Sequence, residues 1–168
     1  APRAEPFVRH MAAQVDHVIV MDNGSTDGTR EILDDLATKL PLTVREDLEP
    51  YPRRQWAKVS QLAEMAGLMG ADWIVAADTD EAWTVTGGGR ISDRVAMLDD
   101  MYETIRAPLY DHVRTGIDEP DENPFRSMVW RRAEASGLPK VAFRWRRGAV
   151  VHEGNHGVTL DPALAAAG

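Results

Sequence analysis

The sequence contains no cysteine and no long apolar run. Without thiols it can form neither a disulfide framework nor a thiolate metal site, which fits a reducing compartment. No stretch approaches the roughly 20 apolar residues that a membrane-spanning helix requires, and no signal-peptide pattern stands at the start. We therefore expect a cytoplasmic protein.

Basic residues are fewer than acidic ones. The 19 Lys and Arg residues against 27 Asp and Glu residues give a formal net charge of -8, and a field of this sign repels nucleic acid. The 168 residues are 43% hydrophobic and 27% charged, which is typical of one soluble globular domain. We expect residues 1–168 to form a single domain that does not bind nucleic acid.

Strand-like and helix-like segments alternate along the chain. Helical spacing of apolar residues covers 29–40 and 55–69, ended by Pro41 and Gly70, and Ser92 is positioned to cap a further helix. Apolar or β-branched runs predict strands at 17–21, 42–45, 73–77, 104–110, 141–145 and 149–152. Such alternation predicts an α/β fold with a mostly parallel central sheet between layers of helices.

The first polar turn, Asp22-Asn-Gly-Ser-Thr-Asp-Gly-Thr29, follows the strand predicted at 17–21. Gly24 and Gly28 permit a positive φ, and the polar residues between them can cap the following helix. The Asp22 carboxylate can accept hydrogen bonds from a base or a ribose. The alternative interpretation is an ordinary helix cap that binds no ligand.

The second turn, Asp78-Thr-Asp-Glu81, follows the strand predicted at 73–77. In an extended segment Asp78 and Asp80 point to the same side, and paired carboxylates suit Mg²⁺ or Mn²⁺ with positions left for diphosphate oxygens. The alternative is a solvated acidic loop. Ligands of open α/β sheets bind outside the carboxyl ends of the strands, so both turns are expected to line one pocket.

Together these motifs resemble the family 2 glycosyltransferases of the GT-A fold, in the subgroup that carries DNGSTDGT and DxD. The matching segments are Asp22–Thr29, Ala71–Glu81, Glu5–Val8 and Gly154–His156. The resemblance implies a Rossmann-like GT-A three-layer sandwich. It also implies a metal-dependent transferase that moves a sugar, with inversion, from a nucleoside diphosphate donor such as UDP-sugar to a hydroxyl of a glycan or small-molecule acceptor. The strand that normally precedes the Glu5 region in this family is absent from the sequence.

The resemblance also implies roles for individual residues. The implied donor-binding residues are Asp22, Asn23, Gly24, Ser25 and Asp78. Arg53, Arg54 and Lys58 are candidates for positive charge there, and the alternative for each of them is a solvated helix face. The implied ligands of Mn²⁺ or Mg²⁺ are Asp78, Asp80 and His156. The Glu-Asp pair that commonly carries the general base is not found, so the candidates for the base are Asp111, Asp118, Asp121 and Glu122.

Three further interpretations stay open. The run His152-Glu-Gly-Asn-His156 has the zinc-peptidase spacing, but that motif requires a helix, and Gly154 and Asn155 are poor helix formers. Without the first strand, the domain could bind a nucleotide or glycan without catalysis. Among the tryptophans, Trp83 and Trp130 are candidates for stacking on an acceptor sugar, whereas Trp56 and Trp73 are expected in the core.

Overall fold

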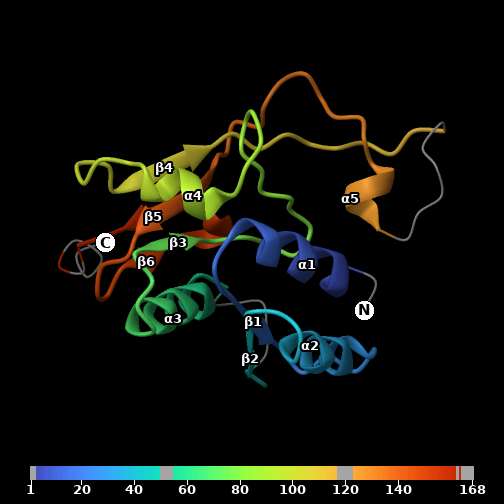
Figure 1. Cartoon of the computed structure of the whole chain (residues 1–168), viewed down its shortest axis with the longest axis horizontal. Helices are drawn as coiled ribbons and strands as arrows, with labels where there is room; N and C mark the ends of the chain where they lie inside the picture. Colours follow the sequence, from blue (N-terminus) through green and yellow to red (C-terminus); the bar gives the residue numbers. More distant parts are fainter. Residues whose placement is uncertain (1–2, 50–54, 117–122, 162, 164–168) are drawn as a thin grey trace.

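A computed structural model describes residues 3–49, 55–116, 123–161 and 163. Helices and strands alternate from the N-terminus as far as β3, and shorter elements follow (Figure 1). The elements are α1 (Ala4–Gln14), β1 (Val18–Asp22), α2 (Thr29–Ala37), β2 (Leu42–Glu46), α3 (Gln55–Leu68), β3 (Trp73–Val75), α4 (Ile91–Ala96), β4 (Thr104–Ala107), α5 (Pro124–Ser127), β5 (Lys140–Arg144), β6 (Val150–Val151), the 3-10 turn η1 (Glu153–Asn155) and β7 (Val158–Thr159).

The described strands form separate ladders instead of one continuous sheet. β1 pairs with β2 in parallel, β5 lies between β3 and β4 and is antiparallel to both, and β6 pairs with β7. The expected parallel pairing is therefore found for β1 and β2 only, and for the later strands the prediction was wrong. Parallel neighbours are usually joined through a crossover helix, and the described parts of the connections from β3 to β5 contain only the short helices α4 and α5, of 6 and 4 residues.

β5 lies at the centre of the core. Its side chains alternate between the two faces of the sheet: Val141 and Phe143 pack in a cluster with Ala63 of α3, whereas Ala142 belongs to the cluster that contains Phe7 of α1. Lys140 to Phe143 are all buried. Elements far apart in sequence are thereby packed on both sides of one strand.

Local signals at the helix ends agree with the structure at the start of α2 and the end of α3, whereas α2 ends at Ala37, before the predicted stop at Pro41. Gly28, at φ 85°, precedes α2, and Gly70, at φ 98°, follows α3. Asp27 Oδ1 accepts hydrogen bonds from the backbone N–H (3.2 Å) and the hydroxyl (2.7 Å) of Thr29. The predicted Ser92 cap was wrong, because α4 begins at Ile91 without a side-chain cap. None of the helices in the described segments is both long and apolar enough to cross a bilayer.

Gly67 of α3 packs directly against the Trp145 ring. A Cβ at this position would lie 2.1 Å from ring atoms of Trp145. Alanine normally stabilises a helix interior by roughly 0.5–1 kcal/mol relative to glycine, but here we expect Gly67→Ala to lower the free energy of unfolding by about 1–3 kcal/mol, the cost of overpacking. Urea denaturation measures the change.

The matched control for this substitution is Gly137→Ala. A Cβ there meets no atom within 4 Å, so its free energy of unfolding should stay within about 0.5 kcal/mol of wild type. If Gly67→Ala proved as stable as the control, the packing of Trp145 on α3 would be disproved.

Candidate functional site

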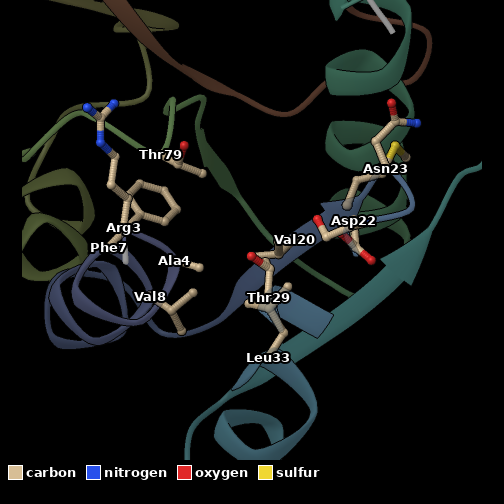
Figure 2. A pocket seen from close by; sticks show the side chains of 12 residues that line it. Arg3, Ala4, Phe7, Val8, Val20, Asp22, Asn23, Thr29, Leu33 and Thr79 are labelled. Carbon is tan, nitrogen blue, oxygen red and sulfur yellow. The ribbon is translucent and has the colours of Figure 1, made fainter. Parts of the chain in front are cut away.

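A pocket of about 320 Å³ lies at the carboxyl end of β1. Figure 2 shows side chains of α1 on one side of it, and the end of β1 with the start of α2 on the other. Its lining residues are Arg3, Ala4, Phe7, Val8, Val20, Met21, Asp22, Asn23, Ser25, Thr29, Leu33 and Thr79. An apolar wall with a few polar groups at one end, in a pocket of this size, is typical of small-molecule sites.

Both polar turns reach this pocket. The first turn contributes Asp22, Asn23 and Ser25, and the second contributes Thr79. Thr79 stands between the two aspartates of the second turn, but Asp78 and Asp80 themselves do not line the pocket. The turns therefore meet at one place, with the second turn at its edge.

Asp22 is held in place within the first turn. Only 4% of its surface is exposed, and its Oδ1 accepts a hydrogen bond from the Ser25 backbone N–H at 3.2 Å. Gly24 adopts φ 72°, a conformation that L side chains rarely adopt. A buried carboxylate at a strand end is well placed to accept hydrogen bonds from a ligand in the pocket.

Asn23 and Lys58 both hold the loop that follows β2. The Asn23 amide donates to the carbonyl oxygens of Asp47 and Glu49. The buried Lys58 ammonium lies 2.7 Å from Asp47 Oδ2 and 2.9 Å from the Glu49 carbonyl oxygen. The hydrogen bond from Lys58 lowers the pKa of Asp47. Lys58 does not line the pocket, and Arg53 and Arg54 lie outside the described residues.

Asp78 is enclosed by donors from three parts of the chain. Its Oδ1 accepts hydrogen bonds from Gln55 at the start of α3 and from Asn155, both at 3.0 Å. Its Oδ2 accepts one from Lys140 of β5 at 2.8 Å. Asp78 therefore ties α3, β5 and η1 together below the second turn.

Lys140 also binds a second carboxylate of the same turn. Its Nζ lies 2.5 Å from Glu81 Oε1 and donates to the Gly154 carbonyl oxygen at 2.6 Å. Burial alone would lower the pKa of Lys140, but its hydrogen bonds to Asp78 and Glu81 and the charges of these two residues outweigh that effect and raise it. Burial raises the pKa of Glu81, against the opposing effect of Lys140. Two carboxylates here share one buried ammonium ion.

Asp80 differs from its two neighbours. Its side chain is exposed, and no hydrogen bond or ion pair joins it to any residue that the structure describes. Of the acidic side chains in the second turn, this is the one open to a ligand from solvent.

His156 is oriented by a hydrogen bond to the main chain. Its Nδ1 lies 3.0 Å from the Pro139 carbonyl oxygen, and a carbonyl oxygen can only accept, so Nδ1 carries the proton. In a neutral ring with this tautomer Nε2 holds the lone pair, the arrangement common in metal-binding histidines. The ring lies over Gly154, where a Cβ would be 2.7 Å from Nε2.

The structure does not gather the predicted metal ligands into one cage. Within residues 3–49, 55–116, 123–161 and 163, no group of three His, Cys, Asp or Glu side chains is arranged to hold a metal ion. Asp78 is bonded to Lys140, while Asp80 faces solvent. Any cation here would take few protein ligands.

The His152–His156 run does not form the helix that a zinc peptidase requires. It follows β6, and the 3-10 turn η1 contains Gly154 at φ 66° and Asn155 at φ 59°. His152 Nε2 lies 2.8 Å from the Thr159 hydroxyl, whereas His156 bonds Pro139. The two histidines do not share a helix face, so the peptidase interpretation is not supported.

The predictions for the base and the tryptophans have mixed outcomes. Asp111 is exposed, with one carboxylate oxygen 3.9 Å from Arg132. Asp118, Asp121 and Glu122 lie outside the described residues.

Trp83 is only 8% exposed and belongs to the core, so its interpretation as an acceptor contact was wrong. Trp56 is 42% exposed and was wrongly expected in the core. Trp130 is exposed, as an acceptor contact requires.

Sequence reasoning missed the partners of Asp78, which are Gln55, Lys140 and Asn155. One signal was present for Lys140: a lysine directly before the apolar run 141–143 is a charge at the edge of a buried strand. Such a lysine requires a counter-charge when it is buried.

Comparison with known proteins gives a family match. The family model described as "Glycosyl transferase family 2" matches residues 1–87, a segment that runs from α1 past the second turn. The chain matches no curated protein and no solved structure.

Proposed function

Because the chain belongs to glycosyl transferase family 2, we propose that it transfers a sugar from a nucleoside diphosphate donor, UDP-linked, to an acceptor hydroxyl with inversion. In this proposal residues 1–168 act as one GT-A domain of the DxD subgroup. The observation that carries the proposal is the pocket of about 320 Å³, because Asp22 of one turn and Thr79 of the other line it together.

The pocket suits the nucleoside part of the donor. Phe7, Val8 and Leu33 provide an apolar wall against which a base can pack. The Asp22 carboxylate accepts a hydrogen bond from the base or the ribose, and the turn at Asn23, Gly24 and Ser25 surrounds it. Lys58 acts indirectly in this arrangement, by holding the loop that Asn23 also contacts.

The second turn suits the diphosphate part. Mg²⁺ and Mn²⁺ need only one or two protein carboxylates when water and substrate phosphates fill the other positions, so an exposed Asp80 fits such an ion, with His156 Nε2 as a further ligand. When bound there, the ion would neutralise charge on the departing diphosphate. Asp78 orients the turn through its bonds to Gln55, Lys140 and Asn155.

The transfer step exchanges two bonds at the anomeric carbon. The acceptor oxygen forms a bond to this carbon as the bond to the diphosphate oxygen breaks, and the transition state resembles an oxocarbenium ion. The acceptor hydroxyl proton passes to a carboxylate on the protein. Asp111, Asp121 and Glu122 are our candidates for this base. Trp130 is the candidate for acceptor stacking, since its side chain is exposed.

The strand that the resemblance implies before Glu5 also has a place in this proposal. Among the described strands, β1 pairs only with β2, and β3 pairs only with β5. Each therefore has an open edge, and α3 contacts both strands. We propose that one further strand of the full GT-A sheet pairs with these edges.

Titration calorimetry with UDP, with and without Mn²⁺, tests the donor site. We expect UDP to bind and Mn²⁺ to tighten the binding, and we expect slow hydrolysis of a UDP-sugar when Mn²⁺ is present. UDP binding without hydrolysis or transfer would favour the non-catalytic binding module. A failure to bind UDP under either condition would contradict the donor assignment.

A further inference from the structure

Lys140 places a permanent positive charge within the acidic second turn. It is 6% exposed, and its Nζ lies 2.8 Å from Asp78 Oδ2, 2.5 Å from Glu81 Oε1 and 2.6 Å from the Gly154 carbonyl oxygen. An ammonium group has three N–H donors, and each has an acceptor here. This lysine is therefore fully bonded and is not available to a ligand.

We propose that Lys140 is a positioning residue that withdraws Asp78 and Glu81 from cation coordination, so that a divalent cation binds firmly only together with the donor diphosphate. The inference rests on the proposed function, which supplies the diphosphate. It concerns the two carboxylates of the turn, Asp78 and Glu81, that Lys140 prevents from acting as metal ligands.

The hydrogen bonds of the two carboxylates support this role. Both oxygens of Asp78 are used, by Gln55 and Asn155 on one side and by Lys140 on the other. Glu81 uses Oε1 for Lys140, and its Oε2 accepts from the Asp78 backbone N–H at 3.2 Å. A cation that approached either residue would have to displace an ammonium ion from a buried pair, which is costly.

Asp80 alone then remains for a cation in this turn. A single exposed carboxylate binds Mg²⁺ or Mn²⁺ weakly, because affinity follows the number of charged ligands. The diphosphate oxygens of the donor would supply the missing ligands. Under this arrangement the empty enzyme holds little metal, and the cation and the nucleotide bind cooperatively.

The position of Lys140 in the fold explains how the turn is held. The antiparallel register pairs Val75 of β3 with Ala142 of β5, which brings the start of β5 level with the residues just before Asp78. Lys140 also binds the carbonyl oxygen of Gly154, next to Asn155. One side chain thus links the second turn to the segment that carries His156.

The test is Mn²⁺ binding without nucleotide, followed through the electron paramagnetic resonance signal of free Mn²⁺. We expect Lys140→Met to bind Mn²⁺ at least about tenfold more tightly than wild type, because three carboxylates are then unneutralised. Lys140→Arg is the matched control, and we expect it to keep the weak binding of wild type because it keeps the charge. A role in folding alone would not tighten metal binding.

A second variant covers the case in which Lys140→Met does not fold. The double variant Lys140→Met/Glu81→Gln removes one charge of each sign, and Asp78 then no longer has an ammonium group as its ion-pair partner. We expect it too to bind Mn²⁺ more tightly than wild type, by a smaller factor. Wild-type Mn²⁺ affinity in the folded variants would overturn the proposal. If UDP does not bind to wild type, the proposed function fails, whereas tighter Mn²⁺ binding by these variants would still support the role of Lys140.

Discussion

Asp80→Ala should abolish the part of UDP binding that depends on Mn²⁺ and leave the fold intact. The side chain is exposed and makes no hydrogen bond or ion pair with a residue that the structure describes, so its removal should change the free energy of unfolding by less than about 0.5 kcal/mol. Loss of residues that merely support a metal ligand costs about 10- to 100-fold in metal affinity, so loss of a direct ligand should cost at least as much. Calorimetry with UDP and Mn²⁺ measures this change.

Asp72→Ala is the control for the Asp80 experiment. Asp72 is another exposed aspartate, located just before β3, and its backbone carbonyl oxygen accepts a hydrogen bond from the Trp145 N–H. This variant should bind UDP as wild type does, with the same response to Mn²⁺. If Asp80→Ala also kept that response, Asp80 would not be the cation ligand and the proposed role of the second turn would be refuted.

Asp22→Ala should weaken UDP binding whether or not Mn²⁺ is present. A hydrogen bond to a charged group contributes about 1.5–3 kcal/mol, which corresponds to roughly 10- to 150-fold in Kd. The same substitution leaves the Ser25 N–H without its acceptor, so the free energy of unfolding should fall by about 1 kcal/mol. Calorimetry and urea denaturation measure the two effects separately.

Asp22→Asn separates the charge of Asp22 from its hydrogen bond to Ser25. The asparagine carbonyl oxygen can still accept from the Ser25 N–H, so the stability should stay close to wild type while the UDP affinity falls. Wild-type UDP affinity in both Asp22 variants would exclude Asp22 from the nucleotide site. Because Asp80→Ala should remove only the metal-dependent part of binding, the two aspartates can be distinguished within one set of titrations.

Several features of the fold and the site could be predicted from the sequence because they depend on residues close together in the chain. Gly28 and Asp27 mark the start of α2 through contacts that span one or two residues. Gly70 ends α3 for the same kind of local reason. The failure of the His152–His156 run to form a helix also follows from nearby residues, since Gly154 and Asn155 adopt positive φ.

Other features could not be predicted because the partners lie far apart in the sequence. Asp78 and Lys140 are separated by 62 residues, and Asp78 and Asn155 by 77. The sequence indicated that Asp78 and Asp80 would both coordinate a cation, since the alternation of side chains along a strand points them to the same side. In the structure Lys140 of β5 forms an ion pair with Asp78, whereas Asp80 is exposed to solvent. Burial of Trp83 and exposure of Trp56 depend equally on distant packing.

The sequence by itself determined the two polar turns, the start of α2, the end of α3 and the resemblance that the family match supports. These rest on backbone preferences and short-range hydrogen bonds, which a few neighbouring residues decide. The tertiary structure alone decided that β5 runs antiparallel between β3 and β4, and that its first residue forms ion pairs with both Asp78 and Glu81. The reason is physical: a buried charge must find its counter-charge in space, and the distance along the chain does not limit which residue supplies it.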